Sequence, residues 1–486
     1  LPAGPGLLER LSEGLGRLPP WAVGAGLLGL ALLVYWLPGS ERFYNHFVWQ
    51  ADAFLHGRAV IEWPVQPFDD NPGNAYFQDV YPVRDAAGRA VGALLPFPPL
   101  PAVVLMPFVA LWGLATDHRA VSVVLGALDV AIAWWVLGRL RLSRRIRLAA
   151  SLFFAFGTVF WYAAQLGTTW FFAHVVAVSA ALLAIGGALG GDAAADDGPP
   201  DRRPGTSPPD TVTSQAAGPM ASAIRAPARL IDRRQLLAGV LFGLACTARL
   251  TVVFGAPFFL FVGSGGSWLR RGASAALGAA IPLGLLLAYN VATTGQLMHP
   301  GYEYQYRLEA TGYPSLGYHP DWSIEDVRYL PQNLGILLLS TPAITPDPLP
   351  TTLGTGDPAC QPPGSVRGLF DRACPLAEPR AIGMSILLTS PAYLLAIPAL
   401  RRGRSRLVAG AALAVASIAV VNLMHFSQGW VQFGYRFSND FVPFALPLVA
   451  LGMARRGGPG RLGALLVGLS IAVNAWGVIW GNILGW

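Results

Sequence analysis

The chain has 486 residues, of which 53% are hydrophobic and only 13% are charged. This composition carries more apolar surface than a soluble domain can bury, so it excludes a soluble enzyme and a soluble nucleic-acid-binding protein. The net charge of +7 is instead typical of arginines retained on the cytoplasmic side of a membrane, near anionic lipid headgroups. We therefore predict an all-α polytopic protein of the plasma (inner) membrane.

Several apolar runs approach the roughly 20 residues that span hydrocarbon. The sequence of residues 1–20 predicts a cytoplasmic segment before a start-transfer helix and not a cleaved signal peptide. We expect crossings at about 21–37, 119–138, 148–166, 170–190, a short pair at 236–248 and 250–262, and then 273–290, 382–400, 407–424, 440–454 and 461–480. These eleven crossings place every arginine cluster on the cytoplasmic side, as the positive-inside rule requires.

The run 99–115 is the ambiguous one. If this run crossed the membrane, the next helix would end outside and would carry the arginine cluster at 139–147 there, against the positive-inside rule. Its prolines also favour a broken or interfacial helix over a continuous span. We therefore predict that this run lies at the outer interface.

These crossings divide the chain into an N-terminal module, 21–190, and a C-terminal module, 235–486. The first carries an outer loop at 39–118, and the second carries one at 291–380. Between the modules, residues 191–234 are rich in proline and mixed charges, which predicts a disordered cytoplasmic linker.

The three cysteines differ in position. Cys246 falls within an apolar helix and is expected to pack there, whereas Cys360 and Cys374 both fall in the second outer loop, where the compartment is oxidising. A disulfide between these two would stabilise the loop by about 3 kcal/mol in the chain-entropy model. Two free thiols are the alternative.

The first outer loop is acidic and aromatic. Its segment 43–55 has apolar residues at helical spacing and predicts an amphipathic interfacial helix, with Glu41 before it and Asp52 within it. A carboxylate at an interface can be merely solvated. Here the acids Glu62, Asp69, Asp70, Asp79 and Asp85 crowd the same loop, which favours a site.

The motifs of this loop carry a family resemblance. Glu41 closes the first predicted span, a helix of the form Tyr…Ala-x-Ala-x-Leu-x-Gly ends at Gly57, and Phe97-Pro98-Pro99-Leu100-Pro101 leads a helix that ends near Trp112-Gly113. The segment from Gly243 to Arg249 is similar to a short helical hairpin that turns on a basic residue. Together with the order of spans, these motifs resemble the C-type (GT-C) integral membrane glycosyltransferases over most of residues 21–480. The branch of protein mannosyltransferases and lipid A aminoarabinose transferases is the most similar.

The resemblance implies transfer of a sugar from a polyprenyl-phosphate donor to a glycan, lipid or protein acceptor on the extracytoplasmic side. The chemistry needs a carboxylate that takes the acceptor proton and cations that hold the departing phosphate. Glu41 and Asp52 are the candidate bases, and the choice between them stays open. Arg249 and Arg436 are the candidate phosphate ligands, with membrane snorkelling and a salt bridge to Asp440 as their respective alternatives.

Further substrate-binding candidates are His174, His46, Tyr302, Tyr306 and Arg307. His174 falls where relatives of the resembled family often carry an acid, and the tyrosines can offer aromatic faces to sugar rings. No metal-ligand spacing is evident in the sequence, although a divalent cation held by the outer carboxylates stays open.

The alternative class is a lipid or solute transporter, or a noncatalytic protein that binds a polyprenyl lipid. A transporter typically carries ionisable residues near the bilayer midplane on broken helices, within two related halves. Here the acids gather in the outer loops and no half-repeat is evident, which favours the enzyme.

Overall fold

The computed structural model describes residues 18–37, 44–62, 79–190, 231–312, 321–347, 356–358, 360, 365–401, 405–429 and 431–486. Glu41 and almost all of the predicted linker 191–234 lie outside these residues. The described part is mostly helical, with a single two-stranded sheet.

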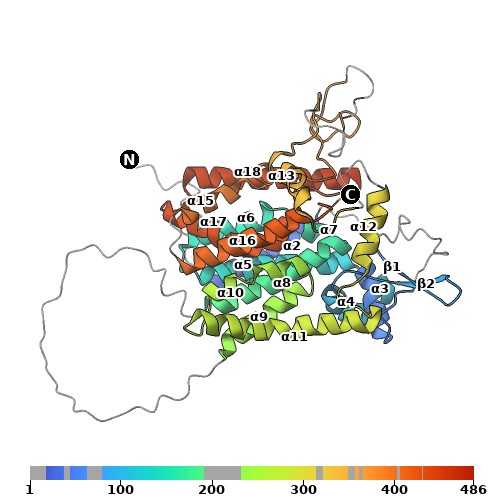
Figure 1. The fold of residues 1–486 in the computed structure, drawn as a ribbon. Helices are drawn as coiled ribbons and strands as arrows, with labels where there is room; N and C mark the ends of the chain where they lie inside the picture. Colours follow the sequence, from blue (N-terminus) through green and yellow to red (C-terminus); the bar gives the residue numbers. More distant parts are fainter. Residues whose placement is uncertain are drawn as a thin grey trace, which may run out of the picture.

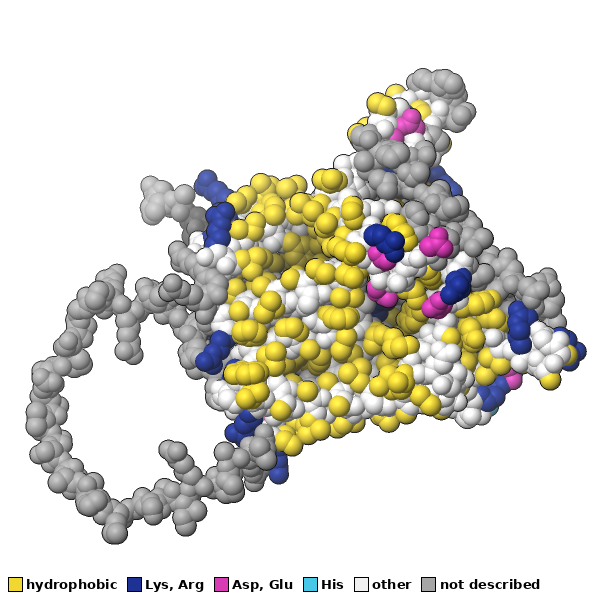
Figure 2. All heavy atoms as spheres, in the orientation of Figure 1, with side chains coloured by type: hydrophobic (Ala, Val, Ile, Leu, Met, Phe, Trp, Pro, Cys, Tyr) yellow, Lys and Arg dark blue, Asp and Glu magenta, His cyan; other side chains and the backbone are white. Residues whose placement is uncertain are grey.

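Long helices run roughly parallel through the body of the molecule (Figure 1). They are α2 (Pro20–Trp36), α5 (His118–Gly138), α8 (Thr169–Leu189), α9 (Arg233–Cys246), α11 (Trp268–Thr294), α16 (Arg406–Met424), α17 (Ser438–Arg455) and α18 (Gly460–Leu484). Figure 2 shows the hydrophobic belt over these helices, with arginines at its left edge and both arginines and acidic side chains toward its right end. We call the left end the inner end and the right end the outer end, after the topology expected from the sequence.

Five of the described helices are long and apolar enough to cross a membrane: α5, α8, α11, α16 and α18. A sixth span results if α6 (Arg144–Phe156) and α7 (Phe160–Leu166), which are bent by 52°, form one crossing. The helices near 21–37, 250–262 and 391–400 are apolar but shorter. An integral membrane protein is thus supported, and the count of eleven crossings stays a prediction.

Two expected helices are interrupted. The region 382–400, predicted as one span, contains α14 (Ile386–Thr389), η7 (Pro391–Ala396) and α15 (Ile397–Leu400). Pro391 and Pro398 explain the interruptions, because proline removes a backbone donor and clashes with the preceding turn. The region 250–262 likewise divides into η3 (Leu250–Gly255) and α10 (Phe258–Phe261).

The outer end of the bundle is built from shorter elements. The amphipathic helix α3 (His46–Leu55) packs against α4 (Leu100–Trp112), and α4 continues into η1 (Gly113–Ala115). Figure 1 shows α4 beside α3 at the right-hand end, where we expected an interfacial helix. Between these helices in the sequence is an unpredicted hairpin of β1 (Tyr81–Arg84) and β2 (Ala90–Leu94), paired antiparallel with Tyr81 opposite Leu94.

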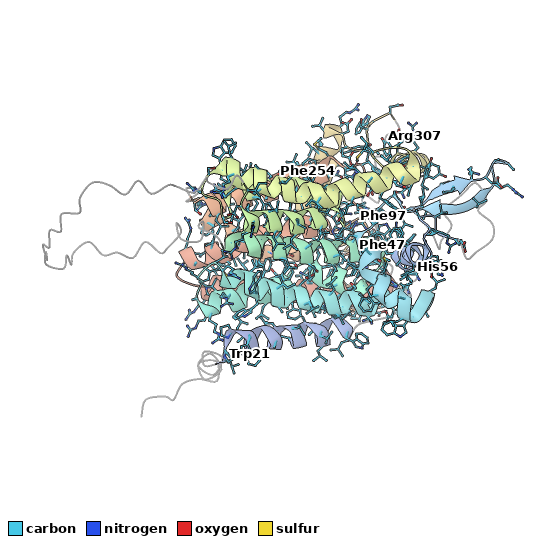
Figure 3. All side chains as sticks on the ribbon, turned by 90° about the horizontal axis from the view of Figure 1, so that it is seen from below. Trp21, Phe47, His56, Phe97, Phe254 and Arg307 are labelled. Carbon is cyan, nitrogen blue, oxygen red and sulfur yellow. A yellow bond between two sulfur atoms is a disulfide. The ribbon has the colours of Figure 1, made fainter. Side chains whose placement is uncertain are left out.

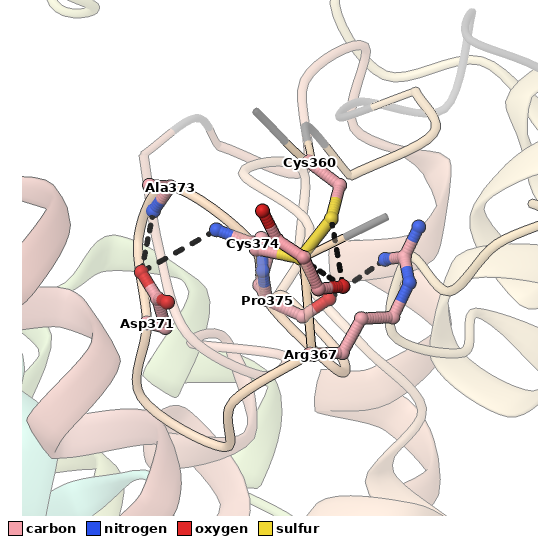
Figure 4. Close-up of a disulfide and its surroundings, with 7 residues drawn as sticks. Cys360, Arg367, Asp371, Ala373, Cys374 and Pro375 are labelled. Atoms are coloured by element: carbon pink, nitrogen blue, oxygen red, sulfur yellow. Dashed lines mark hydrogen bonds between the residues drawn. A yellow bond between two sulfur atoms is a disulfide. The ribbon is translucent and has the colours of Figure 1, made fainter. Parts of the chain in front are cut away.

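The second outer loop adds α12 (Gly301–Gly312), η5 (Val327–Tyr329) and α13 (Leu330–Leu339). It also contains a Cys360–Cys374 disulfide, drawn in Figure 4. Beside the bridge, Asp371 accepts the backbone N–H of Ala373 at 2.9 Å, and Arg367 donates to the Pro375 carbonyl at 2.8 Å. Cys246 is buried in α9 as a free thiol.

Close helix packing depends on small residues. A Cβ atom on Gly278 of α11 would lie 2.1 Å from the Leu236 carbonyl oxygen of α9, so α9 and α11 are in backbone contact there. Small residues allow such an approach between helices in a membrane. On the same helix, a Cβ atom on Gly284 would meet nothing within 4 Å.

This contrast gives a matched test of the packing. We expect Gly278→Ala to lower stability by about 1–3 kcal/mol, because the added methyl must push the helices apart. Gly284→Ala should be neutral or raise stability by up to about 1 kcal/mol through helix propensity. Thermal unfolding of the two purified variants in detergent measures both effects. Equal melting temperatures would contradict the α9–α11 contact.

Candidate functional site

A buried carboxylate, Asp440, lies in the first turn of α17 and contacts four side chains, which come from α8, from α16, from η3 and from the residue before η3. Its Oδ1 contacts His174 Nδ1 of α8 at 2.8 Å and accepts from Arg249 Nε at 3.2 Å. Its Oδ2 accepts from Arg249 Nη2 at 3.2 Å, Thr251 Oγ1 at 2.7 Å and Asn422 Nδ2 at 3.2 Å. Both carboxylate oxygens of Asp440 therefore have hydrogen-bond partners, and the N-terminus of α17 also stabilises the negative charge of the carboxylate.

Local backbone geometry explains how Arg249 reaches this carboxylate. Arg249 follows the end of α9 with φ −140° and ψ 106°, an extended conformation that turns the chain into η3. The side chain is 19% exposed and approaches Asp440 edge-on through Nε and Nη2. A fork of this kind leaves the Nη1 group of the guanidinium for a second ligand.

A second acid, Asp79, lies just before β1 and is partly buried. Its Oδ2 accepts a 2.6 Å hydrogen bond from Trp170 Nε1. Its backbone has φ 63°, which is uncommon for a residue with a side chain and is often found at functional sites. Burial raises the pKa of Asp79 above the ordinary 3.8, while the Trp170 hydrogen bond and the positive charge of Arg436 oppose that rise.

One face of α8 connects the two acids. Gly167, in a left-handed conformation with φ 61°, ends α7, and α8 then starts at Thr169. Trp170 and His174 are four residues apart, so their side chains lie one above the other on the helix. Because Trp170 binds Asp79 and His174 contacts Asp440, this face of α8 lies against both acids, and Asp440 is the more buried of the two.

Arg436 lies in the loop before α17 and shares an aromatic neighbour with Arg249. The Arg249 guanidinium carbon lies 5.3 Å from the Phe437 ring centroid and that of Arg436 lies 5.2 Å from it. Arg436 also lies 5.7 Å from the Phe171 ring centroid. Rings at these distances attract cations and help to hold both guanidinium groups in place. The ion pair of Asp440 that we considered for Arg436 is formed by Arg249.

Tyr302 of α12 borders the same region. Partial burial raises the pKa of Tyr302 to about 12, the Arg249 charge opposes that rise, and the carboxyls of Glu325 and Asp79 add to it. Its ring lies edge-on to Phe97, with centroids 6.2 Å apart.

Burial divides the site into a partly exposed rim and a buried floor. The rim consists of Tyr44, Asp79, Trp170, Arg249, Tyr302 and Arg436, and the floor of His174, Asn422 and Asp440.

Other predicted residues lie around this site. His46 is buried at the start of α3, where its Nδ1 lies 2.8 Å from Thr169 Oγ1 and its ring stacks on Tyr44. It packs against Tyr44 and Trp170 of the rim. Asp52, one of the two expected bases, lies on α3 with its Oδ2 3.5 Å from Nδ1 of the exposed His56.

Tyr306 and Arg307 lie elsewhere on α12. Tyr306 is buried, with its hydroxyl 3.0 Å from that of Tyr329 and its ring 4.9 Å from Phe426. Arg307 lies at the same end of the bundle as His56 (Figure 3). Its side chain is 71% exposed and pairs with Glu303 at 2.5 Å. Tyr306 therefore supports a small outer core, and Arg307 faces solvent.

Within the described ranges, no group of three or more His, Cys, Asp or Glu side chains could hold a metal ion. Glu41, Asp69 and Asp70 lie outside those ranges. The described cluster of two acids, two arginines and a histidine is better suited to binding an anion and moving a proton than to holding a divalent cation.

No protein-family model matches this sequence, and no curated protein matches it. Among solved structures, the chain is similar to two crystal structures of the Archaeoglobus fulgidus oligosaccharyltransferase, one tethered with an acceptor peptide and one in the apo form. The identities are 12% and 11%, and both TM-scores are 0.40. Each match covers 95% of this chain and 55% of the other, so this chain spans about half the length of that enzyme. Similarity at this level does not identify a family.

Proposed function

We propose that this protein is a membrane glycosyltransferase of the GT-C type. It transfers a sugar from a polyprenyl-phosphate donor to a hydroxyl of a glycan, lipid or protein acceptor at the extracytoplasmic face. The observation that carries the proposal is that Arg249 and Arg436 both lie against Phe437, and that the Arg436 charge also acts on Asp79, at the end of the bundle opposite the arginine clusters. The family resemblance of the sequence motifs supports the same chemistry.

In the proposed reaction, the acceptor hydroxyl lies against Asp79. The Asp79 carboxylate takes the hydroxyl proton while the acceptor oxygen bonds to the anomeric carbon, and the bond from that carbon to the phosphate oxygen breaks. The polyprenyl phosphate leaves with its negative charge. General-base assistance of this kind contributes about 10²–10⁴ in rate. Glu41 stays a candidate from the sequence, and Asp52, paired with His56, is the less favoured of the described acids.

The arginines would hold the phosphate as its charge develops. Asp440 fixes the Nε and Nη2 edge of Arg249 and leaves Nη1 outside this ion pair, so the guanidinium would need no reorganisation when the donor binds. Arg436 supplies the second cation, beside Phe171 and Phe437. The polyprenyl chain would then enter the hydrophobic belt.

The function is tested by incubating the purified protein with radiolabelled polyprenyl-phosphate sugars and a mixture of candidate acceptors. We expect label to move from the lipid to an acceptor, with polyprenyl phosphate released. Binding of polyprenyl phosphate without transfer from any donor would support the noncatalytic alternative. Movement of label across sealed vesicles without chemical change would support a transporter.

The proposal also predicts the topology of the chain. A cysteine introduced at Val91, on the exposed hairpin, should react with an impermeant maleimide in intact cells. A cysteine at the exposed Arg456 should react only after the membrane is opened. The native Cys246 is a buried free thiol, so labelling of the protein without an introduced cysteine measures the background reaction. The reverse labelling pattern would place the candidate site in the cytoplasm and contradict the proposal.

A further inference from the structure

A groove lies between α2 and α5 at the inner end of the bundle, far from the candidate site. Figure 3 shows Trp21, which lines it, at the opposite end from His56 and Arg307. The cavity has a volume of about 610 Å³. We call it the inner groove and define it by Trp21, Gly24, Trp134, Trp135, Arg139 and Arg147.

The inner groove is open because small residues line its walls. Gly24 and Ala25 of α2 face Ala131 and Gly138 of α5, where larger side chains would fill the space. A Cβ atom on Gly24 would already lie 3.1 Å from Trp134. The Trp134 indole also donates to the Pro20 carbonyl at 2.9 Å, which fixes the start of α2 against α5. The packing of Trp134 against α2 and its hydrogen bond to Pro20 therefore fix the shape of the groove.

The mouth of the groove is positively charged. Arg147 lies 3.9 Å from the Trp134 ring centroid, and Arg139 lies 4.8 Å from that of Trp135. Both arginines are partly exposed, and Arg147 Nη2 donates to the Trp134 carbonyl at 3.0 Å. None of the residues that line the groove is acidic. Trp21 and Trp135 are 75% and 38% exposed on the same surface. Exposed tryptophans with arginines at a helix end are typical of the headgroup level of a membrane.

We propose that the inner groove binds one anionic glycerophospholipid of the cytoplasmic leaflet. The lipid phosphate lies between Arg139 and Arg147, and an acyl chain follows the apolar walls toward Leu28. Charge complementarity selects an anionic headgroup of the phosphatidylglycerol kind, because a choline or ethanolamine group would place a third cation beside the two arginines. The ligand differs from the polyprenyl donor in both position and leaflet.

The test uses the full-length protein, delipidated in detergent and titrated with dioleoyl-phosphatidylglycerol or dioleoyl-phosphatidylcholine. We expect phosphatidylglycerol to raise the melting temperature of the wild type with saturation, and phosphatidylcholine to have no saturable effect. Arg139→Gln combined with Arg147→Gln should weaken the apparent affinity about ten-fold or more, through loss of charge-assisted hydrogen bonds.

Two further variants separate lipid binding from general damage. Ala131→Leu fills the groove without removing a charge and should abolish the saturable effect. Arg455→Gln combined with Arg456→Gln removes two arginines from the same end of the bundle but outside the groove, and should behave as the wild type.

Several results would overturn the proposal. These are equal responses to the two lipids, a full response from inorganic phosphate alone, or an unchanged response in both groove variants. A saturable response that appears only after deletion of residues 1–17 would show that this segment, and not a lipid, occupies the groove.

Discussion

Asp79→Asn is expected to lower the transfer rate by about 10²–10⁴, because it removes the proton acceptor and preserves shape and the hydrogen bond from Trp170. Single-turnover transfer from a saturating donor measures the loss. Asp85→Asn is the matched control: it lies in the same loop, and its carboxylate pairs with Arg89 at the surface, 2.9 Å away. Wild-type rates for Asp79→Asn would remove Asp79 from the mechanism.

The pH profile gives a second readout of Asp79. A general base must be ionised, so the rate should rise with pH through the raised pKa of Asp79, with a midpoint above the ordinary 3.8. In Asp79→Asn this rise should disappear from the residual activity.

Protein stability should respond to pH in the opposite sense. The folded state holds the Asp79 proton more tightly than the unfolded state does, so its contribution to stability is present at low pH and is lost as pH rises through the folded pKa. Asparagine cannot ionise, so Asp79→Asn should melt at or above the wild-type temperature at pH 7. A melting temperature well below that of wild type would mean that lost activity reports damage to the fold.

Asp440→Asn is expected to lower stability by about 3–5 kcal/mol, because it leaves the Arg249 charge uncompensated beside a buried floor. Donor use should fall as well, since the edge of Arg249 would no longer be fixed. Glu303→Gln is the matched control. Its pair with Arg307, at 2.5 Å, is exposed on both sides, and an exposed pair contributes about 0–1 kcal/mol. Thermal unfolding in detergent compares the two.

Arg249→Ala in the Asp440→Asn background separates the charge effect from packing. If Asp440 serves to compensate Arg249, the double variant should be more stable than Asp440→Asn alone. If the double variant loses as much stability as the two single variants together, the ion pair is not the cause.

Most helices could be predicted because hydrophobic length and arginine position are local signals. The spans 119–138, 170–190 and 273–290 each lie within a few residues of a helix in the structure. The breaks near Gly157 and Pro391 were missed, since the surrounding sequence stays apolar while the backbone bends. The hairpin was also missed. Its strands, Tyr81–Arg84 and Ala90–Leu94, are short and lack a clean alternation of apolar and polar residues.

The candidate site could be predicted only in part. Arg249, Arg436 and His174 were proposed from single positions, and the structure brings all three together. Their meeting depends on Asp440, which is 266 residues from His174 and 191 from Arg249, a relation that no local spacing encodes. Asp79 was visible only as one acid among several, because its burial and its contact with Trp170 arise from tertiary packing.

The most direct test of the central claim is a cryo-electron microscopy structure of the full-length protein with bound polyprenyl phosphate. The account predicts phosphate density within hydrogen-bond distance of Arg249 Nη1 and the Arg436 guanidinium, with the Asp79 carboxyl nearby and the chain leading into the hydrophobic belt. Phosphate density away from both arginines, with the Arg249–Asp440 pair unchanged, would contradict it.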